Sequence, residues 1–368
     1  MHVLVTADTI GGVWTYVREL VTGLVRRDVR VTLVSFGAIP TAQQTSWMDG
    51  LSGLDFRATG FPLEWMQDAE QDIEISSEYL DSIVREVKPD ILHLNQYCYG
   101  ALRIDVPRIV VAHSDVVSWW VAVHGEEPRE SRWTNWYRET VRQGIVSANA
   151  VVAPSKWMLD ALTTHYTKPA QASVIYNGRN PHLFNPHITK EGYVVAVGRL
   201  WDGGKQVNLL TNIDPPVPVC IAGSQEHPDS VHRTSKQARG GRKVRFKGMQ
   251  SESQLRHLYA RASIYAATSR YEPFGLAPLE AALSRCAIVA NNIPSFHEIW
   301  GDAACYFDLN QPVSLQEKIE RLCKDETLRV EFANRAYTLA RERYTGERMV
   351  ESYISLYETV VAAEAAAA

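Results

Sequence analysis

Short runs of β-branched residues alternate with amphipathic helical stretches along most of the chain, and this alternation limits the possible folds more than any other feature. The first half contains five strand-like runs, at residues 2–6, 30–36, 90–94, 108–112 and 150–153. A second series follows at residues 193–197, 217–222, 243–247, 263–267, 287–290 and 305–307. Such alternation predicts parallel β-α units with both sheet faces covered. We therefore predict an α/β protein with two doubly wound, Rossmann-like domains facing a cleft.

The length of the chain also indicates two domains, because 368 residues exceed what a single hydrophobic core usually supports. The turn-rich segment 174–186, between the two series, suits a connection between domains. We place the N-terminal domain at residues 1–177, joined by a C-terminal helix at 347–368, and the second domain at 178–346. Ligands of doubly wound sheets bind beyond the carboxyl ends of the strands, so the candidate residues are sought there.

Composition excludes several classes of protein. Apolar residues make up 45% of the chain and the net charge is −4, which fits a globular protein and not a general polyanion binder. The cysteines are scattered, without a Cys-x-x-Cys pair, at Cys98, Cys220, Cys286, Cys305 and Cys323. No structural zinc or disulfide framework is expected, and a reducing cytoplasm is the simplest setting. The apolar runs are strand-sized, so we expect neither a signal peptide nor a membrane-spanning segment.

Two carboxylates eight positions apart, Glu272 and Glu280, bracket a Phe-Gly-Leu turn between a buried strand and an apolar helix at 276–283. The start of that helix exposes backbone N–H groups, which bind anions. The carboxylates would repel a phosphate, but they can accept hydrogen bonds from hydroxyls. A nucleotide sugar has hydroxyls at both ends and phosphates between them. The alternative is a solvated helix face, and the apolar neighbours of Glu280 argue against it.

Three further groups of residues follow predicted strands. Gly11 and Gly12 come after the first strand and allow close backbone approach to a ligand, although a plain strand–helix turn explains them equally well. His113 follows the strand that ends at residue 112, where a side chain faces the ligand, although lone histidines are often structural. Arg199 and Lys205 follow the first strand of the second domain. Two cations before a helix would suit a diphosphate, and a solvated loop is the alternative.

Together these residues resemble the retaining glycosyltransferases of family 4, which have the two-domain GT-B fold. The resemblance covers nearly the whole chain. Its specific parts are the early Gly-Gly loop, Pro154-Ser-Lys-Trp, Ile175-Tyr-Asn-Gly, Gly198-Arg-Leu, Lys247-Gly-Met and the E-x7-E motif of Glu272 and Glu280. This chain departs from the family in the loop after Arg199. Four residues instead of three separate Leu200 from Lys205, and Gln206 replaces the usual glycine.

The resemblance implies a role for each matching residue. Glu272 would bind hydroxyls of the transferred sugar and Glu280 the ribose hydroxyls. Arg199 and Lys205 would bind the diphosphate, and His113 would lie near the transferred sugar. The remaining donor-binding positions would act largely through the backbone, and they are Gly11, Gly12, Gly198, Gly248, Met249, Phe274, Gly275 and Leu276.

The implied reaction is transfer of a hexose from a nucleotide diphosphate to a hydroxyl of a glycan or lipid-linked acceptor, with retention of anomeric configuration. Such a reaction would serve polysaccharide or glycolipid synthesis. UDP-glucose is the first expectation for the donor, and GDP-mannose is the second. The fold generally needs no metal or other cofactor, and no Asp-x-Asp occurs in the chain.

The sequence says less about the acceptor. Aromatic residues crowd the segment after His113, where they could stack on sugars or only pack between helices; they are Trp119, Trp120, Trp133, Trp136 and Tyr137. A basic run could contact an anionic lipid headgroup at the inner face of the membrane or form a solvated loop; it comprises Arg233, Lys236, Arg239, Arg242, Lys243 and Arg245. No nucleic-acid-binding module is recognisable.

Three other functions are weighed against transfer. A sugar-nucleotide epimerase shares the fold but would lack this form of the E-x7-E turn. A non-catalytic glycan-binding protein would have no need of Glu272, Glu280 and Arg199. A nicotinamide dehydrogenase is disfavoured because the glycine fingerprint is incomplete.

Overall fold

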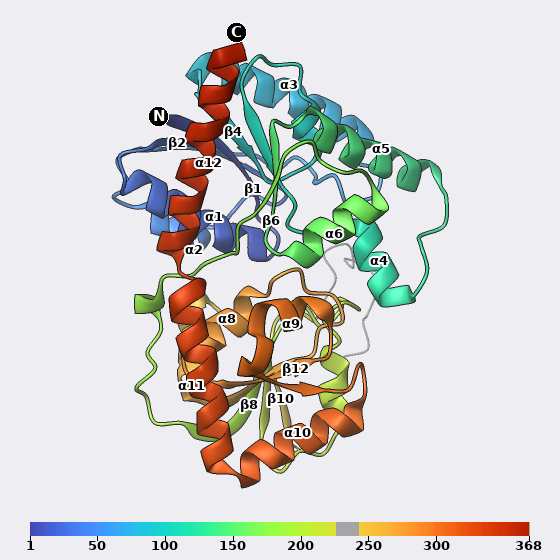
Figure 1. Ribbon diagram of the computed structural model, residues 1–368, viewed down its shortest axis with the longest axis vertical. Coiled ribbons are helices and arrows are strands. Elements are labelled where there is room, and N and C mark those ends of the chain that lie inside the picture. Colours follow the sequence, from blue (N-terminus) through green and yellow to red (C-terminus); the bar gives the residue numbers. More distant parts are fainter. Residues whose placement is uncertain (226–242, 368) are drawn as a thin grey trace. The chain divides into compact units, whose positions relative to one another are not determined.

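The computed structural model describes residues 1–225 and 243–367. The chain forms two compact units, one built from Met1–Gly178 with Gly346–Ala368 and the other from Arg179–Thr345. Each unit contains one parallel sheet with helices on its faces (Figure 1). The predicted class of fold, two doubly wound Rossmann-like units, is therefore confirmed.

The first unit contains a seven-stranded sheet in the order β3-β2-β1-β4-β5-β6-β7. Its strands are β1 (His2–Asp8), β2 (Arg30–Phe36), β3 (Leu54–Ala58), β4 (Ile91–Leu94), β5 (Arg108–Val111), β6 (Ala150–Ala153) and β7 (Ala172–Val174). Its α-helices are α1 (Gly12–Val25), α2 (Ala42–Thr45), α3 (Glu70–Val87), α4 (Val116–His124), α5 (Arg132–Ser147), α6 (Lys156–His165) and α12 (Gly346–Ala367).

Alternate residues of these strands point to opposite faces of the sheet. On one face, Leu4 and Val110 share a core with Leu80 of α3, Val141 of α5 and Met158 of α6. On the other face, α1 packs against α12. The C-terminal helix therefore belongs to the core of the first unit.

The close packing of α1 on α12 depends on Gly23. A Cβ atom at this position would lie 2.5 Å from Cγ2 of Val350 in α12. The absence of a side chain at Gly23 therefore leaves room for the side chain of Val350. Helices α1 and α12 therefore have complementary surfaces at Gly23 and Val350.

The second unit contains a six-stranded sheet in the order β10-β9-β8-β11-β12-β13. Its strands are β8 (Glu191–Val197), β9 (Val219–Ala222), β10 (Val244–Gly248), β11 (Ala262–Ala267), β12 (Ala287–Asn291) and β13 (Ala304–Phe307). Its α-helices are α7 (Glu252–Arg261), α8 (Leu276–Leu283), α9 (Pro294–Trp300), α10 (Pro312–Lys324) and α11 (Glu326–Arg343). Leu315, Ile319 and Leu322 of α10 share a core with strand residues such as Val194 and Ile264.

Both sheets have the strand order of a doubly wound fold. In each unit the order changes direction between the first and the fourth strand along the chain, while the strands themselves stay parallel. The reversal lies between β1 and β4 in the first unit and between β8 and β11 in the second. Crossover helices leave on opposite faces at this point, which opens a crevice beyond the carboxyl ends of the two strands. These two sheet edges are where ligand-binding side chains are expected.

Candidate functional site

In the second unit, the loops after β8 and β11 bring Lys205 and Glu272 into contact. Nζ of Lys205 donates to Oε2 of Glu272 at 2.6 Å, and Oγ of Ser269 donates to the same oxygen at 3.0 Å. The Lys205 side chain is 23% exposed and that of Glu272 is 14% exposed, so a ligand can reach both. The cavity that adjoins the pair has a volume of about 10 Å³. That is space for about one water molecule, so a sugar would contact the pair from outside the cavity.

The turn after Glu272 leads into an α-helix with no side-chain cap. Helix α8 begins at Leu276, and its N-cap residue Gly275 has φ 92°, in the left-handed region. A Cβ at Gly275 would lie 2.8 Å from Cγ of Pro278 and 3.2 Å from Cγ of Glu272, so conformation and space both require glycine. Phe274 is buried and lies edge-on to the ring of Tyr344. The first-turn N–H groups of α8 are therefore available to an anion.

Glu280, one turn into α8, is buried and forms an ion pair inside the protein. Nε of Arg179 lies 2.9 Å from Oε1 of Glu280. Burial raises the pKa of Tyr259 well above its ordinary value, and the charge of Glu280 raises it further. The burial of Glu280, which suggested a ligand in the sequence, is thus already compensated by Arg179.

Both motif carboxylates influence one buried phenol. Burial raises the pKa of Tyr265 in β11, and the charges of Glu272 and Glu280 raise it further. The hydroxyl of Tyr265 donates to the carbonyl of Val197, at the end of β8, at 3.4 Å. Tyr265 therefore links β11 to the end of β8, the two strands between which the strand order reverses.

The loop that carries Arg199 is held by its own residues. Nη2 of Arg199 donates to Oδ2 of Asp202 at 2.7 Å, and the guanidinium lies 4.9 Å from the ring centroid of Trp201. Oδ1 of Asp202 accepts from the N–H of Gly204 at 2.8 Å. The side chain of Arg199 is 38% exposed, so the loop presents a guanidinium that is oriented and still accessible.

The prediction of an α-helix after Lys205 is wrong, because the helix that follows is of another type. The next element is a 3-10 helix of five residues, Val207–Thr211. It is too short to provide an α-helical dipole opposite the two cations. Gln206 has φ 46°, the left-handed conformation that favours the glycine usual in the family. With the oxygen and nitrogen of its side-chain amide exchanged, both atoms find partners. The amide oxygen then accepts from Nε of Arg270 at 2.7 Å, and the amide nitrogen donates to Oδ1 of Asn310 at 2.6 Å.

Three other predicted donor-binding positions lie at this same edge of the sheet. The N–H of Gly198, just after β8, donates to the carbonyl of Ala222 at 3.0 Å. Gly248 ends the edge strand β10, and its carbonyl accepts from the N–H of Gly223 at 2.9 Å. The side chain of Met249 is 76% exposed. Parallel strands end at one edge, so these backbone groups lie beyond the same strand ends as Lys205.

In the first unit, His113 contacts a residue from the neighbouring strand end. Nε2 of His113 lies 2.6 Å from Oδ1 of Asn95, which follows β4. Thr6 holds Asn95 in place through two hydrogen bonds. The backbone N–H of Asn95 donates to Oγ1 of Thr6, and the side-chain amide of Asn95 donates to the backbone carbonyl of Thr6. An amide oxygen only accepts, so Nε2 of His113 carries the proton and Nδ1 does not. Burial lowers the pKa of His113 to about 3, so the ring is neutral near pH 7.

The glycine loop of the first unit resembles the turn before α8. Helix α1 begins at Gly12, and its N-cap residue Gly11 makes no side-chain cap. The N–H of Ile10 donates to Oδ1 of Asp8 at 2.6 Å, which tightens the turn after β1. The first-turn N–H groups of α1 are therefore not capped by a side chain and are available to an anion.

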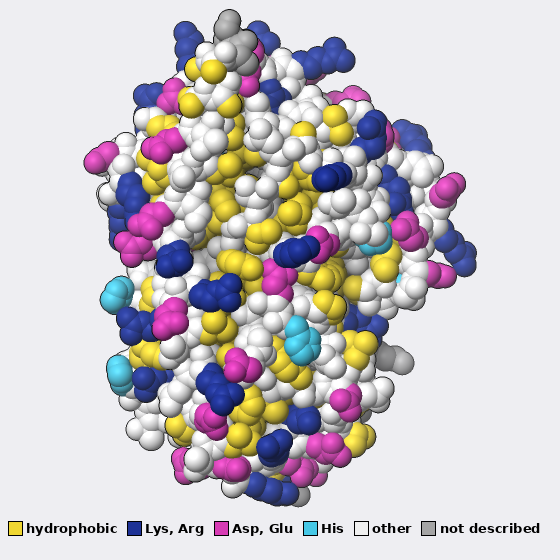
Figure 2. Space-filling model, viewed as in Figure 1, with side chains coloured by type: hydrophobic (Ala, Val, Ile, Leu, Met, Phe, Trp, Pro, Cys, Tyr) yellow, Lys and Arg dark blue, Asp and Glu magenta, His cyan; other side chains and the backbone are white. Residues whose placement is uncertain are grey.

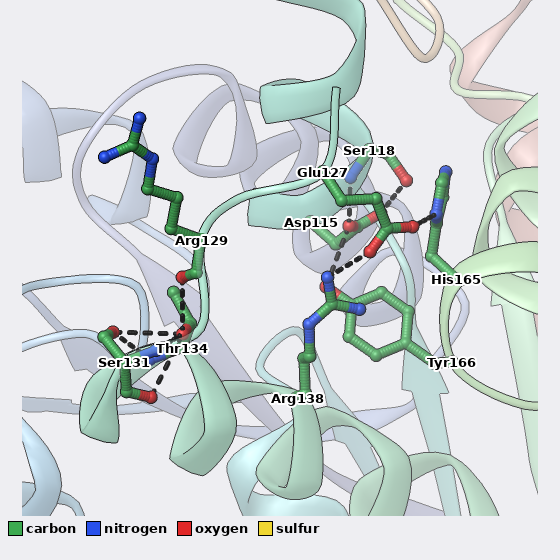
Figure 3. Close-up of polar contacts among 9 residues, drawn as sticks. All are labelled: Asp115, Ser118, Glu127, Arg129, Ser131, Thr134, Arg138, His165 and Tyr166. Carbon is green, nitrogen blue, oxygen red and sulfur yellow. Dashed lines mark hydrogen bonds and ion pairs between the residues drawn. The ribbon is translucent and has the colours of Figure 1, made fainter. Parts of the chain in front are cut away.

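A polar network holds the aromatic segment that follows His113 (Figure 3). Asp115 caps α4 by accepting from the N–H of Ser118 at 2.7 Å, and the hydroxyl of Tyr166 donates to Asp115 at 2.9 Å. Burial raises the pKa of Asp115. Glu127, in the loop after α4, forms an ion pair with Arg138, and its Oε1 lies 3.1 Å from Nδ1 of His165. Helix α4 is therefore anchored at its start and in the loop beyond its end.

Half-buried apolar side chains characterise α4 and the start of α5. In α4 only Val117 and Ser118 are buried, and Trp119 and Trp120 are half-buried. In α5, Tyr137 is buried and stacks on Trp133 with ring centroids 5.6 Å apart. Packing within the unit therefore accounts for Tyr137, whereas Trp119 and Trp120 are only partly buried.

Several features concern metals, membranes and charge. Among residues 1–225 and 243–367, no three His, Cys, Asp or Glu side chains are arranged to hold a metal ion. No helix in the described part of the chain is long and apolar enough to cross a membrane. Charged side chains of both signs are interspersed on the face drawn in Figure 2. Of the basic run, Arg233, Lys236, Arg239 and Arg242 lie outside the described residues.

Sequence reasoning missed four residues of these sites, namely Asn95, Arg179, Asp202 and Ser269. Each is a partner of a predicted residue, and each follows a strand or a domain connection. Asn95 and Ser269 stand just past strand ends, which is a usable signal. Arg179 lies in the connection between the domains, and nothing in the sequence there indicates that its charged side chain is buried.

Comparison with known proteins identifies the class of enzyme. Residues 10–183 match the model described as Glycosyltransferase Family 4, and residues 184–339 match the model of glycosyl transferases group 1. The chain is therefore an enzyme, a glycosyltransferase. Its two Rossmann-like units give it the GT-B fold, and it is similar to family 4.

One relative and two solved structures illustrate the similarity. The O-antigen chain mannosyltransferase RfbU of Salmonella typhimurium is 26% identical over 192 residues, which cover 51% of this chain and about half of the relative, 54%. Sucrose-phosphate synthase of Thermosynechococcus elongatus has a TM-score of 0.78 and 16% identity, covering 99% of this chain and all of that one. Anabaena Alr3699/HepE in complex with UDP-glucose has a TM-score of 0.73 and 16% identity, covering 98% and 100%.

Proposed function

We propose that the protein is a retaining hexosyltransferase that transfers glucose from UDP-glucose to a hydroxyl of a glycan or lipid-linked acceptor, in polysaccharide or glycolipid synthesis. The observation that carries this proposal is the Lys205–Glu272 pair beside the uncapped start of α8. A cation and helix N–H groups suit a diphosphate. The carboxylate of Glu272, just before α8, suits the hydroxyls of a sugar. A nucleotide sugar presents both groups in one molecule.

The residues present suit a direct displacement on the sugar. The acceptor oxygen forms a bond to the anomeric carbon while the bond from that carbon to the diphosphate oxygen breaks. The acceptor proton passes to a phosphate oxygen, on the face from which the diphosphate leaves, so configuration is retained without a protein nucleophile. Negative charge builds on the diphosphate, where Lys205, Arg199 and the first N–H groups of α8 stabilise it. Glu272 orients the sugar through its hydroxyls.

The neutral state of His113 fits a positioning role. With its pKa lowered to about 3 by burial, the ring carries no charge near neutral pH. Because Nε2–H donates to Asn95, Nδ1 is left to accept one hydrogen bond in a fixed orientation. We assign it to a hydroxyl of the transferred sugar, and not to proton transfer.

The choice of donor rests on similarity. HepE, a fold neighbour, is described in complex with UDP-glucose, which favours UDP-glucose. RfbU is described as a mannosyltransferase, which makes GDP-mannose the second candidate. Base contacts near Gly248 and Met249 would be made largely by the backbone, and these positions leave little base-specific signal in the sequence.

Other parts of the proposal concern the surroundings of the reaction. The half-exposed Trp119 and Trp120 would contact the acceptor, since aromatic rings stack on sugar faces. We propose that the enzyme needs no metal, because cations and helix amides supply the required charge. We place it in the cytoplasm, with weak association at the inner membrane face when the acceptor is lipid-linked.

The test combines ligand binding with turnover. A thermal-shift screen with UDP, GDP and ADP should show the largest rise in Tm for the nucleotide of the donor. The purified enzyme should then release that diphosphate slowly from its sugar nucleotide, with EDTA present. Glu272→Ala should abolish release and leave diphosphate binding largely intact, and Glu326→Ala, at an exposed carboxylate of the same unit, should change neither. No release with any common donor, or full turnover by Glu272→Ala, would overturn the proposal.

A further inference from the structure

A fully buried arginine at the start of the second unit contacts the motif carboxylate Glu280. The side chain of Arg179 is 0% exposed, and Nε lies 2.9 Å from Oε1 of Glu280. Its Nη2 donates to Oε1 of Glu252 at 2.8 Å. We propose that Arg179 is a positioning residue that orients the Glu280 carboxylate toward the ribose hydroxyls of the donor. This inference rests on the function proposed above.

The guanidinium is placed by a fixed backbone. The N–H of Arg179 donates to the carbonyl of Tyr344 at 3.1 Å, and Arg179 forms a parallel bridge with Thr345. The guanidinium carbon also lies 5.5 Å from the ring centroid of Phe184. Backbone, ion pairs and ring contact leave little freedom to the side chain. A guanidinium held in this way presents its charge to the Glu280 carboxylate from a fixed position.

The charges of this group suit a polyol better than a phosphate. Two carboxylates share one guanidinium, so Arg179, Glu252 and Glu280 together carry an excess of one negative charge. Such a group accepts hydrogen bonds from hydroxyls and repels anions. The positive groups of the site are Lys205 and the start of α8, which lies one turn before Glu280. The ribose and diphosphate of one nucleotide would thus meet groups of opposite character.

Packing alone gives no reason for the pair. The neighbours Leu279, Ala281 and Ala282 are completely buried, so an apolar residue at position 280 would suit the helix. Buried ion pairs are often replaced by apolar side chains without loss of stability. Stability alone therefore does not require the Arg179–Glu280 pair, which leaves a functional role for the carboxylate.

Binding of UDP and of 2′,3′-dideoxy-UDP, measured by calorimetry, tests the inference. The native enzyme should bind UDP about tenfold or more tightly than the dideoxy compound, because the hydrogen bonds to a charged carboxylate are lost. Glu280→Gln should bring this ratio close to one. Arg179→Met should lower the ratio similarly, and Arg179→Lys, which keeps the charge without the planar fork, should lower it less. Adding Arg179→Met to Glu280→Gln should not change the ratio further.

Arg329→Met is the matched control, since Arg329 is a partly buried arginine of the same unit that pairs with Glu326. It should lower Tm and leave the ratio unchanged. If Arg179→Met lowers Tm only, and the ratio stays as in the native enzyme, the positioning role is wrong. If Glu280→Gln leaves the ratio unchanged, the ribose role of Glu280 fails instead. If Arg179→Met does not fold, an unchanged ratio in Arg179→Lys overturns the inference.

Discussion

Nζ of Lys205 lies 2.6 Å from Oε2 of Glu272, although the two residues are 67 positions apart in the chain. One follows β8 and the other follows β11, the strands between which the sheet reverses. The ion pair joins the proposed phosphate-binding cation to the proposed sugar-binding carboxylate. A bound diphosphate would compete with Glu272 for the ammonium group. Loss of Lys205 should therefore also disturb the position of Glu272, whereas loss of Glu272 leaves the ammonium group free for the diphosphate.

Replacing Lys205 with methionine should lower kcat/KM for the donor by about 10²–10³-fold, because a cation that stabilises the leaving diphosphate is lost. Initial rates over a range of donor concentrations measure this change. Lys324→Met, at a lysine 76% exposed, serves as the control and should keep the native rate. A Lys205→Met enzyme with native kcat/KM would remove Lys205 from the proposed mechanism.

Gly275→Ala should destabilise the second unit by about 1–3 kcal/mol, since residue 275 has a positive φ and its Cβ would press on Pro278. Urea unfolding monitored by fluorescence gives the free energy. Donor turnover should fall as well, because the start of α8 would shift. Gly192→Ala is the matched control, as a Cβ there meets no atom within 4 Å. Equal stability of the two variants would show that the turn tolerates a side chain.

Stability should fall with acidity because of His93. Burial, and secondarily the charge of His113, lowers the pKa of His93 to about 3, below the 6.5 of the unfolded chain. The unfolded state therefore binds more protons between these values, and the contribution present above pH 6.5 is lost as pH falls toward 3. The slope from His93 alone is at most about 1.4 kcal/mol per pH unit. Urea titrations from pH 7 to 4 should show a shallower slope for His93→Gln, and an unchanged slope would contradict this assignment.

Tyr357→Phe should weaken the attachment of α12 to the first unit. The Tyr357 hydroxyl lies 2.6 Å from Nδ1 of His93, and the Tyr16 hydroxyl lies 3.1 Å from Nε2. Losing the first contact leaves a buried ring nitrogen without its partner, which costs about 1–3 kcal/mol. Proteolysis at the C-terminus and urea unfolding both report the change. Ser355→Ala, at an exposed position of α12, should change stability by less than about 0.5 kcal/mol.

The strands buried on both faces were predictable, and the edge strands of the first sheet were not. Residues 30–36 and 150–153 form strands with the predicted bounds, because apolar β-branched runs have few alternatives. Strands β3 and β7 were missed. Both are sheet-edge strands with partly exposed residues. An edge strand is held by hydrogen bonds to a neighbour, and its own side chains show little periodicity.

The candidate residues were found by their position after strands, but their partners were not. Glu280 was recognised as a carboxylate on an apolar helix that needs compensation. That Arg179 supplies it could not be read from the turn-rich connection. Arg199 was predicted to serve a ligand, and the structure adds that Asp202 orients it. The helix expected after Lys205 is a short 3-10 helix, because positive φ at Gln206 redirects the chain.

The sequence alone determined the strand–helix alternation, the two Rossmann-like units and the motif around Glu272. These depend on local periodicity and on turns that only certain residues adopt. The tertiary structure decided which charges meet, namely Lys205 with Glu272, Arg179 with Glu280, and Asn95 with His113. Parallel strands bring residues distant in sequence to one sheet edge, and burial at that edge decides which polar groups must pair.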